Sequence, residues 1–184
     1  MRRQIRSSVF ETNSSSTHSI AISKKPVTAG KHVCFEIGEF GWENSCVDIS
    51  DYLYTAILEQ SEADELLERL KEILDKHSIQ YEFEAPIWRN SSGGKYKWLD
   101  NGHIDYSDRT REFIFAVLND EDLLMRCLFG DSCVYTGNDN QDNEPSGCNI
   151  AEEYIYVEDE RGNYVEQLNP YHDPENYDYF YKGN

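Results

Sequence analysis

The chain has 184 residues, of which 39% are hydrophobic and 13% aromatic. This length corresponds to one domain, or to one domain with a small appendage, and it can bury a core without disulfides or structural metal ions. Thirteen tyrosines and eight phenylalanines are too many for a disordered chain. The net charge of −18 argues against direct binding of nucleic acid, because such a protein repels phosphates.

The charge is unevenly distributed along the chain. Residues 1–31 carry six Lys or Arg and one Glu, a net charge of +5, so the remainder carries −23. The last 48 residues hold twelve acidic residues and two basic ones. An acidic surface of this kind is explained either by solubility alone or by attraction to a basic protein surface, and both interpretations stay open.

The cysteines and the apolar runs of the sequence indicate the cellular compartment of the protein. The chain has five cysteines, an odd number, without a CxxC pair. Residues 1–17 lack the continuous apolar stretch of a secretory signal, and no apolar run is long enough to cross a membrane. We therefore expect a cytoplasmic protein with free thiols and no contact with membranes.

The first part of the chain predicts two strands and a helix. Alternation at residues 19–23 and 32–37 is typical of short strands, and Gly38 and Gly41 should close the second one. Ser50 is predicted to cap the following helix. The apolar face of this helix consists of Leu53, Tyr54, Ile57 and Leu58.

A second helix has a clear amphipathic pattern. Ser61 and Asp64 resemble a capping box, and the helix should reach about His77. Its apolar residues follow the i, i+1, i+4, i+7, i+8 spacing of a helix packed on one side; they are Leu66, Leu67, Leu70, Ile73 and Leu74. Its acidic residues, which include Glu65, Glu68 and Glu72, face mainly outward. Residues 79–84 alternate and predict a strand.

The middle of the chain predicts two more helices. Residues 89–98 form a loop or hairpin tip around Gly93 and Gly94. Ser107 should cap the third helix. The fourth should begin near Asp120 and end at Gly130.

The last part of the chain predicts strands and a polar loop. Residues 132–135 should form a strand that runs into the loop 136–147, and residues 151–157 and 164–168 should form a hairpin. The order of elements predicts an α+β fold, a single domain with a mixed or antiparallel sheet and about four helices. We expect residues 1–150 to form the core domain, and the acidic hairpin and tail of residues 151–184 to pack on it or extend from it.

Two polar segments in the first quarter of the chain contain candidate site residues. In residues 11–19, hydroxyls that include Ser15 and Ser16 surround His18. A hydroxyl beside an imidazole can act as a nucleophile with its base; the alternative is a turn held by local side-chain hydrogen bonds. In residues 38–43, Trp42 forms a binding platform or packs over a turn at a strand end.

Two later segments contain candidate acid–base or ligand groups. In a strand, His103 and Asp105 lie on the same face, where they can act as a general base with its orienting acid or as metal ligands; the alternative is a structural hydrogen bond. Asn138 and Asp139 follow a predicted strand, where sites are often built, although both are also ordinary turn formers. Since two ligands do not make a metal site, no cofactor is predicted, and a divalent metal ion stays an open alternative.

Several well-known sequence motifs are absent. The chain has no Gly-rich phosphate loop, no GxSxG elbow and no HExxH motif. It also lacks the cysteine and histidine spacing of zinc fingers and the aromatic signature of RNA-binding domains. The enzyme and binding classes that depend on these motifs are therefore excluded.

The polar segments, taken together, resemble a known family. VFETNSSSTHSI, GEFGW, DYLYTAI, GHIDYSD and LFGDSCVYTGNDN are similar to segments of an uncharacterised protein family of Firmicute phages and related mobile elements. The similarity extends in patches from residue 9 to residue 140, and FETNSSSTHS and TGNDN are its most specific parts. The resemblance implies a phage or mobile-element source, and it supplies no mechanism and no catalytic residues.

Two functions from different classes remain. The first is an acidic interaction protein that binds a basic host protein or nucleoprotein complex. It would inhibit a nucleic-acid-binding defence complex by competing with phosphates, so its binding should weaken with salt. The residues predicted to bind the partner are Glu65, Glu68, Glu72, Glu152, Glu153, Glu158 and Asp159.

The second function is an enzyme or a small-ligand binder. His103 would be a base or ligand, Asp105 its orienting acid and Asp139 a second acid or ligand, with His18 close to them. An enzyme needs these groups in one cleft, whereas an interaction protein needs a charged surface and no pocket. The residues predicted to contact the ligand are Ser15, Ser16, Trp42 and Asn138.

Overall fold

The fold combines helices and strands in the part of the chain that the computed structural model describes, residues 16–41, 45–92, 94, 96–105, 110–138, 150 and 153–182. The helices in this part are α1 (Ile49–Leu58), α2 (Ala63–Lys76), α3 (Arg111–Asn119), α4 (Glu121–Phe129) and a short 3₁₀-helix, η3 (Pro170–His172). The strands are β1 (Ser16–Ser23), β2 (His32–Phe35), β3 (Glu39–Phe40), β4 (Ser45–Val47), β5 (Gln80–Phe83), β6 (Trp88–Asn90), β7 (Lys97–Leu99), β8 (His103–Ile104), β9 (Ser132–Asn138), β10 (Tyr154–Glu158), β11 (Tyr164–Leu168) and β12 (Tyr177–Lys182). The predicted α+β class is confirmed.

An antiparallel sheet of four strands, in the order β12-β1-β9-β4, lies at the centre of the molecule. β1 pairs with β9 on one side and with β12 on the other. The other strands form two-stranded pairs, of which β2–β5 and β3–β8 are parallel and β6–β7 and β10–β11 are antiparallel. Parallel and antiparallel pairing therefore occur together, as the prediction of a mixed or antiparallel sheet allowed.

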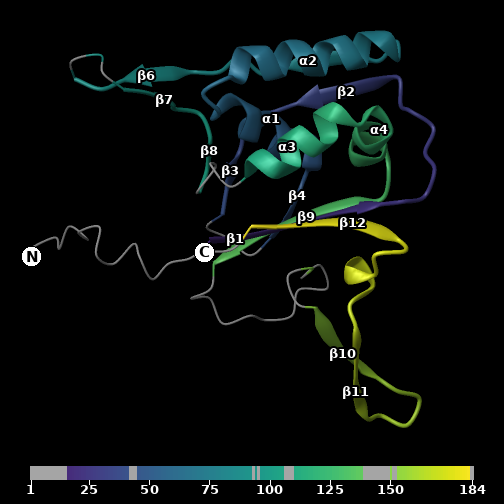
Figure 1. Ribbon diagram of the computed structural model, residues 1–184. Coiled ribbons are helices and arrows are strands. Elements are labelled where there is room, and N and C mark those ends of the chain that lie inside the picture. The colour runs from purple at the N-terminus through teal and green to yellow at the C-terminus, as the bar shows by residue number, and fades with distance from the viewer. Residues whose placement is uncertain are drawn as a thin grey trace, which may run out of the picture.

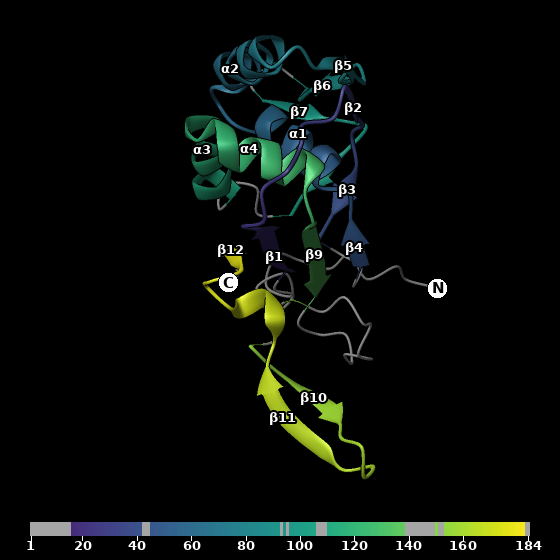
Figure 2. The same ribbon diagram turned by 90° about the vertical axis from the view of Figure 1, so that its right-hand side faces the viewer.

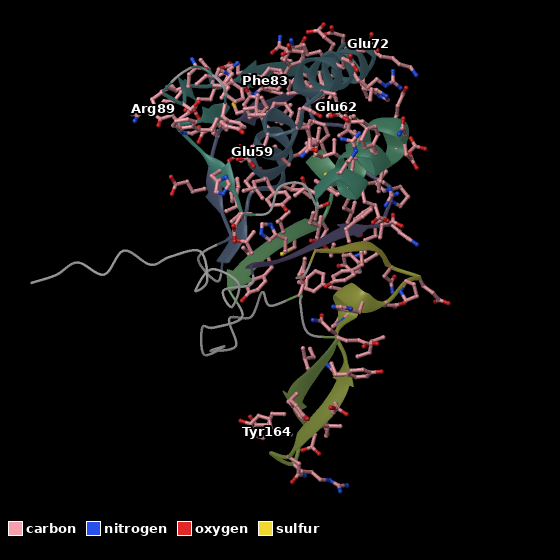
Figure 3. The ribbon with its side chains drawn as sticks, turned by 60° about the vertical axis from the view of Figure 1, so that its left-hand side comes forward. Glu59, Glu62, Glu72, Phe83, Arg89 and Tyr164 are labelled. Atoms are coloured by element: carbon pink, nitrogen blue, oxygen red, sulfur yellow. The ribbon has the colours of Figure 1, made fainter. Side chains whose placement is uncertain are left out.

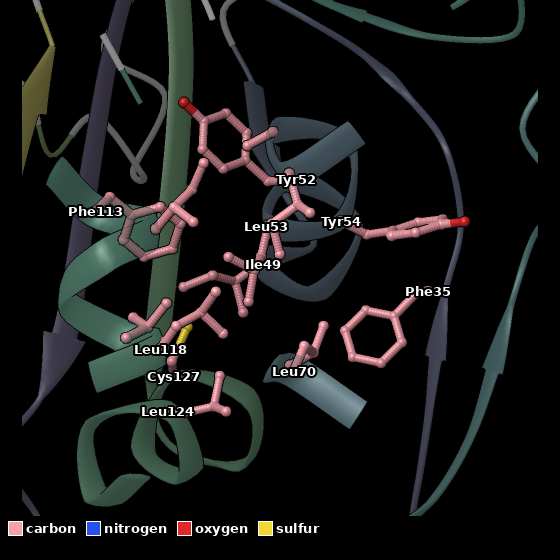
Figure 4. Packing of buried hydrophobic residues seen from close by; sticks show 14 of the residues in the cluster. Phe35, Ile49, Tyr52, Leu53, Tyr54, Leu70, Phe113, Leu118, Leu124 and Cys127 are labelled. Carbon is pink, nitrogen blue, oxygen red and sulfur yellow. The ribbon is translucent and has the colours of Figure 1, made fainter. Parts of the chain in front are cut away.

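The α-helices α1 to α4 gather on one face of the central sheet, with α2 farthest from it (Figure 1). The hydrophobic core fills the space between these helices and the sheet. In Figure 4, Tyr52 and Leu53 of α1 lie between Phe113 of α3 and Phe35 of β2, and all four side chains are buried. None of the helices in the described ranges has the length and apolar composition that crossing a bilayer requires.

The alternation along β1 explains why both of its faces are covered. Ile20 and Ile22 pack into the core below the helices, whereas Ala21 belongs to a smaller cluster on the opposite face. Successive side chains of a strand point to opposite faces, so the local pattern predicted residues 19–23 correctly, although the strand begins earlier, at Ser16. On the second face, the Tyr179 hydroxyl of β12 donates to Oγ of Ser19 at 3.0 Å.

The first two helices form where they are predicted, but α1 also buries residues outside its predicted apolar face, among them Tyr52 and Ala56, and neither N-terminal cap matches its prediction. α1 is capped by Asp48, whose Oδ1 accepts a hydrogen bond from the backbone N–H of Ser50 at 2.8 Å. The predicted cap, Ser50, therefore lies inside the helix. α2 begins after Glu62 without a side-chain cap, so the predicted capping box is wrong. Asp and Ser have similar preferences for the cap position, and sequence alone does not decide between neighbouring candidates.

The third helix also begins later than predicted. α3 starts after Thr110 without a side-chain cap, so Ser107, which lies outside the described residues, is not its cap. α4 follows the prediction more closely. Oδ1 of Asp120 accepts from the backbone N–H of Leu123 at 3.0 Å, and the helix ends at Gly130.

The strand before the predicted polar loop is longer than expected. β9 continues through Thr136 and Gly137 to Asn138, where the sequence predicted a loop. Thr136 is buried, because β9 lies between β1 and β4 and pairs with both. Pairing with β4 ends at Thr136, whereas pairing with β1 continues through Gly137 and Asn138 and outweighs the turn preference of these two residues.

The acidic, aromatic tail supplies an edge of the central sheet. β12 pairs with β1 over six positions, from His18↔Lys182 to Ser23↔Tyr177. Nη1 of Arg126 in α4 lies 2.9 Å from a carboxylate oxygen of Asp178 in β12. This ion pair connects the edge strand to α4. The β10–β11 hairpin projects from the sheet on the side opposite to the helices (Figure 2).

Candidate functional site

A surface ion pair joins His103 to Glu59. β8 places His103 beside the end of α1, where Glu59 follows the last helical residue. Nδ1 of His103 lies 2.8 Å from Oε1 of Glu59, and the backbone N–H of Ile104 donates to Oε2 at 3.1 Å. Both carboxylate oxygens are thus held, and the Glu59 side chain is 13% exposed compared with 56% for His103.

The charge environment of His103 is acidic. The hydrogen bond to Glu59 is the largest cause of a rise in the pKa of His103 above its usual range, and the charges of Asp105 and Glu39 add to it. β8 ends at Ile104, so Asp105 lies in the turn that follows. The acid that contacts Nδ1 of His103 is therefore Glu59, in place of the predicted Asp105. A histidine oriented by a carboxylate in this way can act as a general base.

His103 and Glu59 lie at a groove of about 750 Å³ between the α1–α2 connection and the β6–β7 hairpin. Two tryptophans, Trp88 and Trp98, belong to its lining, and the ammonium group of Lys97 lies 4.1 Å from the centre of the Trp88 ring. In Figure 3, Glu59 and Glu62 lie on the same side of the molecule, near this hairpin. Aromatic faces together with carboxylates suit a flat ligand with a positive or hydroxyl-bearing edge.

Replacing Glu59 with glutamine should lower the pKa of His103 towards its ordinary value of about 6.5. A raised pKa in the folded state means that protonated His103 stabilises the fold below the ordinary value, and that this contribution is lost as the pH rises through the raised one. An NMR titration of the His103 ring measures the change. Glu62→Gln, which alters a carboxylate of the same groove, should leave the titration unchanged. An equal pKa in wild type and Glu59→Gln would contradict the assignment.

His18 lies in a different environment from His103. It is fully buried in β1, and its Nδ1 lies 2.7 Å from the hydroxyl oxygen of Tyr52. Burial raises the pKa of Tyr52 above its usual range, so this hydroxyl keeps its proton. His18 is not among the residues that line the groove at His103, and the structure therefore places the two histidines in separate surroundings.

The remaining predicted ligand residues lie at or beyond the borders of the described ranges. Ser16 and Asn138 are paired backbone positions at the ends of β1 and β9, and their side chains are outside the described part. Three other predicted site residues, Ser15, Trp42 and Asp139, lie wholly outside the described ranges, as does Glu152, which was predicted to bind a partner.

Those acidic residues predicted to bind a partner that the structure describes divide into two groups at opposite ends of the molecule (Figure 1). One group, Glu65, Glu68 and Glu72, is exposed on α2. Lys71 Nζ lies 2.7 Å from a Glu68 oxygen, and Arg69 Nη1 lies 3.3 Å from a Glu72 oxygen. Bases of the same helix thus offset two of its three predicted acids.

The second acidic group lies on the β10–β11 hairpin. Residues 153–168 carry five acidic residues and one arginine, a net charge of −4. Glu153 and Glu158 are exposed. Oδ1 of Asp159 accepts the backbone N–H groups of Arg161 and Asn163 at 2.8 Å each, and these bonds lower the pKa of its carboxyl group. Asp159 thus shapes the turn of the hairpin.

Six side chains of this hairpin form one exposed surface, which we name the tyrosine face. Its members stand opposite each other in the β10–β11 ladder and therefore share a side of it; they are Tyr154, Leu168, Tyr156, Glu166, Glu158 and Tyr164. Tyr156 is 68% and Tyr164 73% exposed, and Figure 3 shows Tyr164 pointing away from the hairpin. The prediction overlooked these tyrosines, although their alternation in YIYVE and YVEQL contains the signal.

A separate cluster of three possible metal ligands lies on the β2–β5 pair. His32, Cys34 and Glu82 are all exposed, and one ligand atom from each lies within 4.8 Å of the others. Local sequence patterns do not predict this cluster, because Glu82 is far from the other two residues along the chain.

Comparisons with known protein families, with curated proteins and with solved structures find no significant match for this chain. The resemblance to a phage or mobile-element family stays a prediction. Function is therefore inferred from the contacts and charges described above.

Proposed function

We propose that this protein is an acidic interaction protein that docks on a basic protein partner through the tyrosine face. The observation that supports the proposal is the exposure of three tyrosines beside acidic residues on a projecting hairpin. An isolated two-stranded hairpin is marginally stable in water. Exposed aromatic patches mark interaction surfaces, and tyrosine is among the residues that contribute most to binding energy.

The charge of the hairpin defines the chemistry of the partner. A net charge of −4 over residues 153–168 favours a positively charged surface with apolar pockets for the tyrosine rings. Positively charged grooves are the surfaces that bind nucleic-acid phosphates. We therefore propose that the hairpin competes with nucleic acid for such a groove and inhibits a host nucleic-acid-binding complex, in keeping with a phage or mobile-element source.

The hairpin fits this role better than α2. Two of the three predicted acids of α2, Glu68 and Glu72, pair with bases of the same helix, and its apolar stripe is turned inward to the core. The hairpin instead presents its aromatic residues to solvent. Since the two elements lie at opposite ends of the molecule (Figure 1), a small partner contacts one of them and not both.

Photo-cross-linking should locate the partner on the tyrosine face. Tyr164 is replaced by p-benzoylphenylalanine, and the full-length protein is cross-linked in host lysate. We expect the captured protein to be basic and to be captured at low salt far more than at high salt. The charge reversal Glu158→Lys with Glu166→Lys should weaken binding of the purified, captured protein by about tenfold or more. A nucleic-acid ligand of that protein should displace the hairpin.

The matched control carries the same cross-linker at Glu72 on α2, which is also exposed and lies at the other end of the molecule. It should not capture the same protein. Equal capture from both positions, a captured protein that is acidic, or binding that survives the double charge reversal would each contradict the proposal.

A second candidate function is binding or turnover of a small ligand in the groove at His103. It is favoured by the contact between Nδ1 of His103 and Glu59, which orients the imidazole at the edge of a groove that holds two tryptophans. In this role His103 would act as the base and Glu59 as its orienting acid. The titration of Glu59→Gln described above tests the pair on which this role depends.

A further inference from the structure

We propose that His32, Cys34 and Glu82 bind a transition-metal ion of the zinc type on the outer face of the β2–β5 pair. The site is independent of the docking function proposed above, because β2 and β5 lie beside α2 and the hairpin is at the other end of the molecule (Figure 2). It also uses none of the residues that line the groove at His103.

The strand pattern brings the three side chains to one face. In β2, Val33 and Phe35 are buried, whereas His32 and Cys34 are exposed. Residues two apart in a strand share a face, so the imidazole and the thiol point outward together. The parallel register places Glu82 of β5 directly beside Cys34. The sheet thus presents nitrogen, sulfur and oxygen donors side by side.

The imidazole of His32 lies between the other two donors. Its Nε2 is 3.3 Å from Oε1 of Glu82, and its Nδ1 is 3.9 Å from Sγ of Cys34. Two ligands of a tetrahedral zinc ion, with Zn–N of about 2.0 Å and Zn–S of about 2.3 Å, lie roughly 3.5 Å apart. The Glu82 side chain is 79% exposed, so it has room to rotate and bring its carboxylate to the nitrogen that binds the ion.

The donor set determines the class of metal. Thiolate and imidazole favour zinc and its neighbours in the first transition row, whereas magnesium and calcium prefer oxygen ligands. The Cys34 thiol releases its proton to solvent when the metal–sulfur bond forms. Three protein ligands leave the fourth tetrahedral position open for water or for a donor from another molecule. The ion would also join two strands whose ligands are far apart in the sequence.

Cobalt titration of the full-length protein tests the site, because Co²⁺ replaces zinc and reports thiolate ligation through a near-ultraviolet charge-transfer band. We expect saturation at one equivalent of Co²⁺ and displacement by Zn²⁺. Cys34→Ser should abolish the charge-transfer band. His32→Ala and Glu82→Gln should each weaken Co²⁺ binding by about tenfold or more. All three positions are exposed, so these variants should keep the wild-type circular dichroism spectrum.

Two control variants separate this site from other donors. Sγ of Cys46 lies 3.6 Å from Sγ of Cys133, so Cys46→Ser removes one member of another pair of thiols that could bind Co²⁺. His77→Ala alters another histidine that contacts a carboxylate, that of Glu121. Both should leave the cobalt spectrum unchanged. Absence of the charge-transfer band in the wild type, its persistence in Cys34→Ser, or its loss in Cys46→Ser would overturn the proposal.

Discussion

Replacing Leu70 with alanine should lower the free energy of unfolding by about 2–5 kcal/mol. Leu70 is fully buried, and α2 packs against α1, α3 and β5. Figure 4 shows its side chain between those of Phe35 and Leu124. The truncation removes buried methyl groups and leaves a cavity that the surrounding helices and strand fill only in part. Denaturation in urea, followed by circular dichroism, measures the loss.

The control for Leu70 lies on the same helix. Glu72 is 68% exposed and pairs with Arg69, so Glu72→Ala should cost less than about 1 kcal/mol. The difference between the two losses of unfolding free energy measures the packing of the apolar stripe, because both substitutions place alanine in the same helix. Similar losses for Leu70→Ala and Glu72→Ala would show that α2 is not packed on the core as described.

Replacing Tyr52 with phenylalanine should lower the free energy of unfolding by about 1–3 kcal/mol. The substitution keeps the buried ring and removes the hydroxyl group that lies 2.7 Å from Nδ1 of His18. Loss of one member of a buried hydrogen bond costs more than its net contribution, because the other member stays away from water. Urea denaturation of Tyr52→Phe, His18→Leu and the double variant gives the coupling energy between the two side chains.

The cycle also decides the role of His18. A structural pair should give a coupling energy of at least about 0.5 kcal/mol, and the His18 variants should bind the hairpin partner as the wild type does. Additive effects of the two substitutions would contradict the pairing. Loss of partner binding in a stably folded His18→Leu variant would instead assign His18 to the functional surface.

The candidate site was predictable only in fragments. His103 was identified from its GHIDYSD segment, but its contact, Glu59, comes from the end of another element. Nothing in the local sequence indicated that α1 would end beside β8. The cluster of His32, Cys34 and Glu82 was missed for the same reason, since it depends on parallel pairing of β2 with β5. The tyrosine face is a different case. Its alternating pattern is present in the local sequence, so it could have been predicted.

The sequence by itself determined the elements whose pattern is local. The stripe of α2, the alternation of β1, β2 and β5, and the two arms of the β10–β11 hairpin follow from periodicities of 3.6 and 2 residues, which depend on neighbouring residues alone. The acidic balance of the hairpin is equally a property of the chain.

The tertiary structure decided which elements meet and where several of them begin and end. β9 extends to Asn138 because β1 pairs with it as far as that residue, and β12 becomes an edge strand because it pairs with the other side of β1. It also decided that His18 is buried against Tyr52 and that His103 contacts Glu59. These outcomes depend on hydrogen bonds and packing between distant segments, and local sequence patterns carry no information about which segments will pair.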